Sequence, residues 1–252
     1  MFKKTAVGLD IADHTIEVVE LEQSIFSHAP RVVARGRKAL LPGIVEAGRI
    51  LLRKQLLEAV TTLMDETLPH PIQSREVIFG VPERQVYTAL VDIRLEKGTP
   101  LADQIEHSVK ESIPLEDNDL IYTYRTMSQT ASSARVVIYG TSKETLIEWN
   151  EFFESGGFRV RAFDHELLAI VRGLFADRIP KSLCVVDIGA ERTKIAAYDN
   201  TGLQYVHSIE IAGDYFTEHI ARSMDVTKEV AEQTKKVIWR LRCHRSFWQS
   251  NH

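Results

Sequence analysis

The sequence has few of the residues that mark disulfide-rich or membrane-spanning proteins. Among 252 residues there are two cysteines, and no run of 18 apolar residues occurs. Two cysteines support neither a disulfide framework nor a zinc site, and the short apolar runs predict no membrane-spanning helix. The first residues include two lysines, but the apolar stretch meets Asp10 too soon for a secretory signal. We therefore expect a soluble protein of the cytoplasm.

Charge of either sign is not in large excess, but it is unevenly spread. The chain has 31 Lys and Arg against 35 Asp and Glu, and 44% of its residues are hydrophobic, which is an ordinary globular composition. Residues 235–252 hold five basic side chains and no acidic one, which leaves the body acidic and without an electrostatic reason to bind nucleic acid. We interpret residues 239–252 as an atypical tail, with the natural sequence interrupted near Ile238. A basic, aromatic tail that touches nucleic acid or membrane is the alternative.

Hydrophobic periodicity predicts an α/β fold with mixed sheets. Strands are expected at residues 5–11, 15–22, 31–40, 76–81, 85–93, 120–125, 135–139, 158–163 and 182–187, with further strands up to Ile211. Helices are expected at residues 46–68, 100–113, 143–155, 166–176, 215–223 and 227–237. Thr99 is the expected N-cap of the second helix, and Thr141 with Glu144 forms a capping box for the third. Cys184 falls in a strand that we expect to be buried.

One short pattern occurs twice, 177 residues apart. An apolar strand ends in Asp10 in the first copy and in Asp187 in the second, and each is followed by a small-residue turn and a returning strand. Backbone amides in such a turn form an anion-binding concavity, and the carboxylate suits a hydrated Mg²⁺. Two such hairpins facing each other predict a site for the β- and γ-phosphates of a nucleotide. Because the two aspartates repel each other without a cation, metal and nucleotide are expected to bind together.

On these residues the chain resembles the FtsA/PilM family of cell-division and type IV pilus assembly proteins, which have an actin-like (ribonuclease H-like) ATPase fold. The resemblance covers residues 5–238, with Leu9-Asp10-Ile11 and Val186-Asp187-Ile188-Gly189-Ala190 matching the two phosphate hairpins. Residues 104–115, 143–168 and 211–221 resemble further segments of the family. The resemblance implies a first lobe (1–84), an inserted small αβ subdomain (85–163), a connecting helix (164–181) and an incomplete second lobe (182–238).

The resemblance also implies a site for ATP and Mg²⁺, in which Asp10 and Asp187 hold the metal through water. The nucleotide-binding positions that it implies are Asp10, Ala12, Asp13, Thr15, Asp187, Gly189, Ala190, Thr193, Gly213 and Asp214. Glu166 is a candidate for orienting a hydrolytic water. The simpler reading of Glu166 is a solvated carboxylate that the dipole of its helix stabilises.

Four residues depart from the family's pattern. Ala12 stands where the family has glycine, and Asp13 opposes a phosphate unless it is turned away or shares the metal. Glu191 and Arg192 replace small or hydroxyl residues in the second turn. The chain also stops before the family's glycine-rich adenosine motif, a loss of about 3–4 kcal/mol, or a few hundredfold in affinity. We therefore expect at most a weak ATPase, and an inactive one in the chain as it stands.

By this resemblance the protein assembles a structure rather than carrying out metabolism. The first lobe and the inserted subdomain would bind the cytoplasmic tail of an inner-membrane pilus protein, and nucleotide occupancy would bias that affinity. The protein would reach the membrane only through this partner, and self-association stays open. The alternatives are an FtsA-like division protein, a nucleotide-free scaffold and a small-metabolite kinase of the same superfamily. Substrate-stimulated ATP consumption would identify the kinase.

Overall fold

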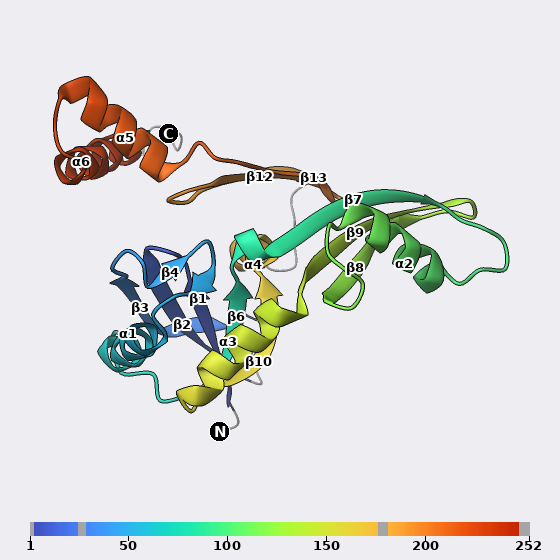
Figure 1. Ribbon diagram of the computed structural model, residues 1–252, viewed down its shortest axis with the longest axis horizontal. Coiled ribbons are helices and arrows are strands. Elements are labelled where there is room, and N and C mark those ends of the chain that lie inside the picture. Colours follow the sequence, from blue (N-terminus) through green and yellow to red (C-terminus); the bar gives the residue numbers. More distant parts are fainter. Residues whose placement is uncertain (1–2, 25–28, 176–180, 247–252) are drawn as a thin grey trace. The chain divides into compact units, whose positions relative to one another are not determined.

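The computed structural model describes residues 3–24, 29–175 and 181–246, and the chain divides into two compact units, residues 1–179 and 180–252. Helices and mixed sheets alternate along the chain (Figure 1), so the predicted α/β class is confirmed. Within the described ranges, no helix combines the length and the apolar character that a membrane span requires.

A five-stranded mixed sheet forms the centre of the first unit. Its strands, in spatial order, are β10 (Arg159–His165), β6 (Glu76–Val81), β1 (Lys3–Ile11), β2 (Thr15–Ser24) and β3 (Arg31–Ala39). β1, β6 and β10 run parallel, and β2 pairs antiparallel with both β1 and β3, so β2 alone is reversed in this sheet. Helices α1 (Arg53–Glu66) and α3 (Lys143–Ser155) contribute to the core of this sheet, where Phe79 packs against Trp149 and Phe153.

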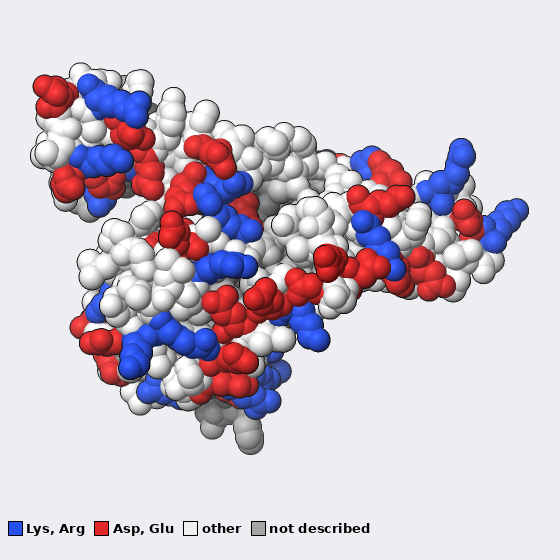
Figure 2. Space-filling view, viewed as in Figure 1, with Lys and Arg blue, Asp and Glu red and all other residues white. Residues whose placement is uncertain are grey.

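Strand β3, at one edge of this sheet, carries basic side chains. Arg31 pairs with Glu22, and Arg37 pairs with Glu17, both on β2. Charged edges of this kind discourage unwanted strand pairing. On the face of the molecule in Figure 2, acidic and basic side chains are interspersed.

An inserted subdomain follows the short 3₁₀ helix η1 (Glu83–Gln85). It consists of β7 (Val86–Arg94), α2 (Leu101–Ser112), β8 (Leu120–Gln129) and β9 (Ser133–Ser142), with the strands in the antiparallel order β7-β9-β8. Helix α2 buries Ile105 and Val109 against one face of that sheet. Helix α3 contributes to the core of the first sheet, and strand β10 pairs with β6 in that sheet.

A hairpin of β4 (Val45–Glu46) and β5 (Arg49–Ile50) occupies the place where periodicity predicts the start of the first long helix. Its turn residues Ala47 and Gly48 have φ of 52° and 74°, which is left-handed and incompatible with an α-helix. The prediction that this helix begins at residue 46 is therefore wrong, and α1 begins at Arg53.

The predicted N-caps are also wrong by one residue. Ser142 caps α3, because its Oγ accepts a hydrogen bond from the Thr145 amide at 3.1 Å. The Thr141 hydroxyl instead donates to the Gln85 carbonyl at 2.6 Å. Pro100, rather than Thr99, is the N-cap of α2. Helix α4 (Glu166–Phe175) then follows β10, as the sequence predicts.

The second unit begins with a three-stranded antiparallel sheet of β11 (Ser182–Ile188), β12 (Thr193–Asp199) and β13 (Gly202–Ile209). Helices α5 (Gly213–Met224) and α6 (Lys228–Ser246) complete it, and α6 continues beyond residue 237, where a helix end is predicted. The expectation that Cys184 is buried is wrong. Cys184, Val186 and Ile188 alternate on an exposed face of β11, because no described residue covers that face.

Candidate functional site

The first predicted phosphate hairpin is formed by β1 and β2. Asp10 lies one residue before the end of β1, in register with Glu17, and Ile11 pairs with Ile16. The turn is closed by the Ala12 amide, which donates to the Thr15 carbonyl at 2.9 Å. The hairpin predicted around Asp10 is confirmed, and Asp10, Ala12 and Thr15 are together at one end of it.

Asp10 is part of a row at the carboxyl ends of three parallel strands. Gly80 of β6 is in register with Asp10 on one side and with Asp164 of β10 on the other. A Cβ placed on Gly80 would lie 3.7 Å from Asp10 Oδ1, which is an ordinary van der Waals contact. Strand ends of this kind are common ligand sites in α/β sheets. Asp164 pairs with Arg172 of α4. Sequence reasoning missed Asp164, although its position between the expected strand 158–163 and the expected helix 166–176 was a usable signal.

The Asp13 carboxylate is held by a different turn. Its Oδ2 accepts from the Ala47 amide at 2.8 Å, and its Oδ1 accepts from the Gly48 amide at 3.1 Å. Both oxygens are therefore engaged by the β4–β5 turn. Asp13 would oppose a bound phosphate unless its carboxylate were turned away or shared the metal. In the structure the carboxylate is turned toward the β4–β5 turn.

The second predicted hairpin, β11–β12, repeats the register of the first. Asp187 again lies one residue before the end of its strand, here in register with Lys194, and Ile188 pairs with Thr193. The turn closes through the Gly189 amide, which donates to the Arg192 carbonyl at 3.0 Å. This hairpin is confirmed as well.

The start of helix α5 is tied to this second turn. The Gly213 amide donates to the Gly189 carbonyl at 3.0 Å, and the Asp214 amide donates to the Ala190 carbonyl at 2.8 Å. The Thr193 hydroxyl donates to the Ile211 carbonyl at 2.6 Å. The structure thus brings together all the predicted positions of the second unit, which lie at two places in the sequence.

Basic side chains accompany Asp187. Lys194 Nζ lies 3.8 Å from Asp187 Oδ2, and Lys194 is only 7% exposed. Arg192 pairs with Glu210 at 2.7 Å. Because an ammonium group offsets the charge of Asp187, this carboxylate is a weaker ligand for Mg²⁺ than a carboxylate without such a neighbour.

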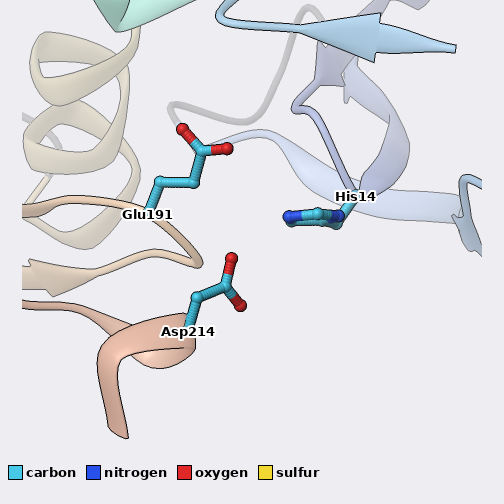
Figure 3. Close-up of side chains that lie close together, drawn as sticks. All are labelled: His14, Glu191 and Asp214. Atoms are coloured by element: carbon cyan, nitrogen blue, oxygen red, sulfur yellow. The ribbon is translucent and has the colours of Figure 1, made fainter. Parts of the chain in front are cut away.

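Two carboxylates lie beside the second turn. Glu191, on the β11–β12 turn, and Asp214, in the first turn of α5, lie close together (Figure 3), and each has a carboxylate oxygen within 4.8 Å of one on the other. Like charges at this distance repel, and a divalent cation relieves the repulsion. The third side chain labelled in Figure 3, His14, belongs to the β1–β2 turn of the first unit, where its carbonyl accepts from the Leu40 amide.

A polar cluster behind Gly213 escaped the sequence reasoning. Lys235 Nζ of α6 donates to the Gly213 carbonyl at 2.8 Å and to Thr217 Oγ1 at 2.7 Å, and it pairs with Glu232 at 2.6 Å. Burial raises the pKa of the Glu232 carboxyl, but hydrogen bonds from Lys235 and Thr217 outweigh it and hold the pKa below its usual value. The i,i+3 spacing of Glu232 and Lys235 was visible in the sequence, whereas their distant partners were not.

The donor set fits the expected cofactor in part. Asp10, Glu191 and Asp214 offer carboxylate oxygens, which are the ligands that Mg²⁺ prefers. Lys194 and Lys235 place positive charge near the second turn, as a polyphosphate requires. Glu166 is the first residue of α4 and half-buried, a position where the helix dipole favours a carboxylate.

Comparisons with known proteins show the family and the fold. The family described as type IV pilus assembly protein PilM matches residues 8–238. A chain of the PilM–PilN type IV pilus biogenesis complex superposes with a TM-score of 0.76 at 19% identity, over 93% of this chain and 70% of that one. The ethanolamine utilization protein EutJ from Carboxydothermus hydrogenoformans gives a TM-score of 0.52 at 16% identity, over 92% and 61%. These structures show the fold, which is actin-like.

Among curated proteins, the cell division protein FtsA of Streptococcus pneumoniae serotype 2 strain D39 is 25% identical over 162 residues. The match covers 64% of this chain, but the chain spans only 29% of that relative's length. The predicted resemblance is therefore confirmed at the level of the family and the fold. With its two Asp-containing hairpins and a family match over most of its length, the chain belongs to the PilM family of type IV pilus assembly proteins.

Proposed function

We propose that this protein binds Mg–ATP at its two hairpin turns and binds the cytoplasmic tail of an inner-membrane, PilN-type pilus protein. It acts as an assembly protein at the cytoplasmic face of the inner membrane and reaches the membrane through that partner. The observation that carries the proposal is the repeated hairpin, with an Asp one residue before the strand end in both units. The PilM–PilN complex supports the choice of partner.

In this proposal Asp10 and Asp187 hold Mg²⁺ through water, and the Lys194 ammonium offsets part of the charge of Asp187. The β1–β2 turn with Ala12 and Thr15, and the β11–β12 turn with its neighbours in α5, bind phosphate oxygens. When bound, Mg²⁺ would neutralise part of the phosphate charge and polarise the γ-phosphate. Glu166 remains the candidate for orienting water.

The inserted subdomain offers a surface for an extended peptide. β8 is an edge strand, and it exposes Ile121, Tyr122 and Tyr124 at 36–42%. Along β8 only Arg125 is charged, unlike β3 at the edge of the first sheet. An edge strand with few charges and exposed apolar side chains accepts an added strand readily, and we propose that the membrane partner's tail binds there.

Calorimetric titration with ATP and Mg²⁺ tests the nucleotide half of the proposal. Asp10→Asn removes the charge that holds the metal and is expected to weaken Mg-dependent binding roughly tenfold or more. Asp65→Asn, an exposed aspartate on α1, is the matched control and leaves binding unchanged. Equal binding of Mg–ATP by wild type and Asp10→Asn would refute the role of Asp10 and the nucleotide half of the proposal. No binding by either would favour a nucleotide-free scaffold.

Fluorescence anisotropy with labelled tail peptides of the host's inner-membrane pilus proteins tests the partner half. Tyr124→Lys places a charge on the β8 edge and is expected to abolish binding. Val32→Lys, on the edge strand β3 and 57% exposed, is the control and leaves binding intact. A tail that binds both variants equally docks elsewhere.

A further inference from the structure

The Asp13 carboxylate stabilises a turn that is costly to form. Ala47 is a non-glycine residue with φ of 52°, and Gly48 follows with φ of 74°. Left-handed backbone is unfavourable for alanine, so the turn requires outside support. Two charge-assisted hydrogen bonds, at 2.8 and 3.1 Å, provide that support from Asp13 of the β1–β2 turn.

The opposite side of the same turn is bound by Gln85. Its Nε2 donates to the Ala47 carbonyl at 2.8 Å. Its Oε1 accepts from the Thr145 hydroxyl at 3.1 Å, and its own carbonyl accepts from the Thr141 hydroxyl at 2.6 Å. Both threonines are buried, at 8% and 6% exposure, so these bonds are shielded from water.

Gln85 occupies the junction between the first sheet and the inserted subdomain. It is the last residue of η1, directly before β7. Thr141 lies near the end of β9, and Thr145 lies in the first turn of α3, where the chain returns from the subdomain. Gln85 therefore lies at the entry to the subdomain, and its carbonyl and its side chain bond to two residues at the exit from it.

The β4–β5 turn has no room to absorb a displacement. A Cβ placed on Gly48 would lie 2.7 Å from Pro82 Cβ and 3.2 Å from Gln85 Cγ. Close-packed interiors transmit small movements to their neighbours instead of absorbing them. A shift of Asp13 is thus passed through the turn to the residues of the junction.

We infer that Asp13 and Gln85 are positioning residues of a hydrogen-bonded relay that couples the β1–β2 turn to the base of the inserted subdomain. The relay consists of Asp13, Ala47, Gly48, Gln85, Thr141 and Thr145. This inference rests on the proposed function in one respect. A nucleotide bound at the β1–β2 turn would, through the relay, restrict the motion of the inserted subdomain that binds the partner. The coupling is reciprocal, so partner binding would tighten nucleotide binding by the same factor.

Hydrogen–deuterium exchange on the full chain, with and without ATP and Mg²⁺, tests the relay. Without ligand, Asp13→Ala is expected to speed exchange roughly fivefold in residues 44–50, and also in residues 83–88 and 141–149, as the loss of a hydrogen bond gives. Asp13→Asn, which keeps one acceptor, serves where Asp13→Ala folds poorly and gives a smaller effect with the same distribution. Gln104→Ala is the control, since Gln104 makes comparable bonds within the subdomain to residues 96 and 99.

With ATP and Mg²⁺, the wild type gains protection in residues 8–18 and 141–149. Gln85→Glu loses the Nε2 donor to Ala47 and is expected to keep the first protection while losing the second. A ligand-free effect of Asp13→Ala confined to residues 44–50 would overturn the relay. Absence of any protection in residues 8–18 would overturn the proposed nucleotide site alone, because the ligand-free comparison still decides the relay.

Discussion

Two glycines, Gly43 and Gly48, both have a positive φ but have different surroundings. Comparing them separates the cost of backbone strain from the cost of overpacking. Gly43 has φ of 80°, Gly48 has φ of 74°, and a Cβ on Gly43 would meet nothing within 4 Å among the described residues. A Cβ on Gly48 would meet Pro82 at 2.7 Å. Both alanine variants are strained, but only Gly48→Ala also overfills a packed junction.

The magnitudes follow from these two terms. Left-handed backbone costs an alanine about 1 kcal/mol, which is the full expected loss of stability for Gly43→Ala. Overpacking adds about 1–3 kcal/mol, so Gly48→Ala is expected to lose about 2–4 kcal/mol. Urea unfolding measures both, followed by the fluorescence of the buried Trp149 in a background where it is the single tryptophan. Equal losses for the two variants would refute the close packing of the β4–β5 turn against η1.

Three further predictions concern α4 and the second unit. Gly173→Ala is expected to stabilise the first unit by about 0.5–1 kcal/mol in urea unfolding, because Gly173 lies within α4 and a Cβ there would meet nothing within 4 Å among the described residues. Gly213→Ala places a Cβ 3.1 Å from the Gly189 carbonyl and is expected to cost about 1–2 kcal/mol in the same assay; an unchanged stability would contradict that contact. Because the folded pKa of Glu232 is depressed, its contribution is complete above the ordinary value of 4.5 and is lost as pH falls through the lower folded pKa. Circular dichroism against pH checks this, and Glu232→Gln is expected to remove that part of the pH dependence.

The two hairpins could be predicted because their pattern is local. A strand, an Asp, a small-residue turn and a returning strand occupy about a dozen successive residues in each case, and no distant partner is needed to recognise them.

The start of α1 could not be predicted, because the residues that decide it are far apart. Ile50 and Leu52 continue the helical spacing of Leu56 and Val60, so periodicity places them in the helix. The β4–β5 turn forms instead because Asp13, more than thirty residues earlier, binds its amides. The position of β10 has the same cause, since its pairing with β6, which is distant in the sequence, places it in the first sheet.

Part of the candidate site depended on tertiary contacts as well. The sequence identified Gly189 and Gly213 separately, and the amide of one meets the carbonyl of the other only in the fold. Lys235 was noticed merely as a basic residue, because its role at the Gly213 carbonyl comes from the packing of α6 beside α5. Cys184 was misjudged because an apolar strand gives no sign of whether both faces are covered.

The most direct test of the proposed nucleotide site is a crystal structure grown with ATP and Mn²⁺, with anomalous data collected for the metal. We expect a manganese peak roughly 4 Å from the Asp10 carboxylate, the distance that one bridging water gives. We also expect phosphate oxygens on the amides of both the β1–β2 and the β11–β12 turns. Manganese and nucleotide bound away from Asp10 and both turns would contradict the proposed site.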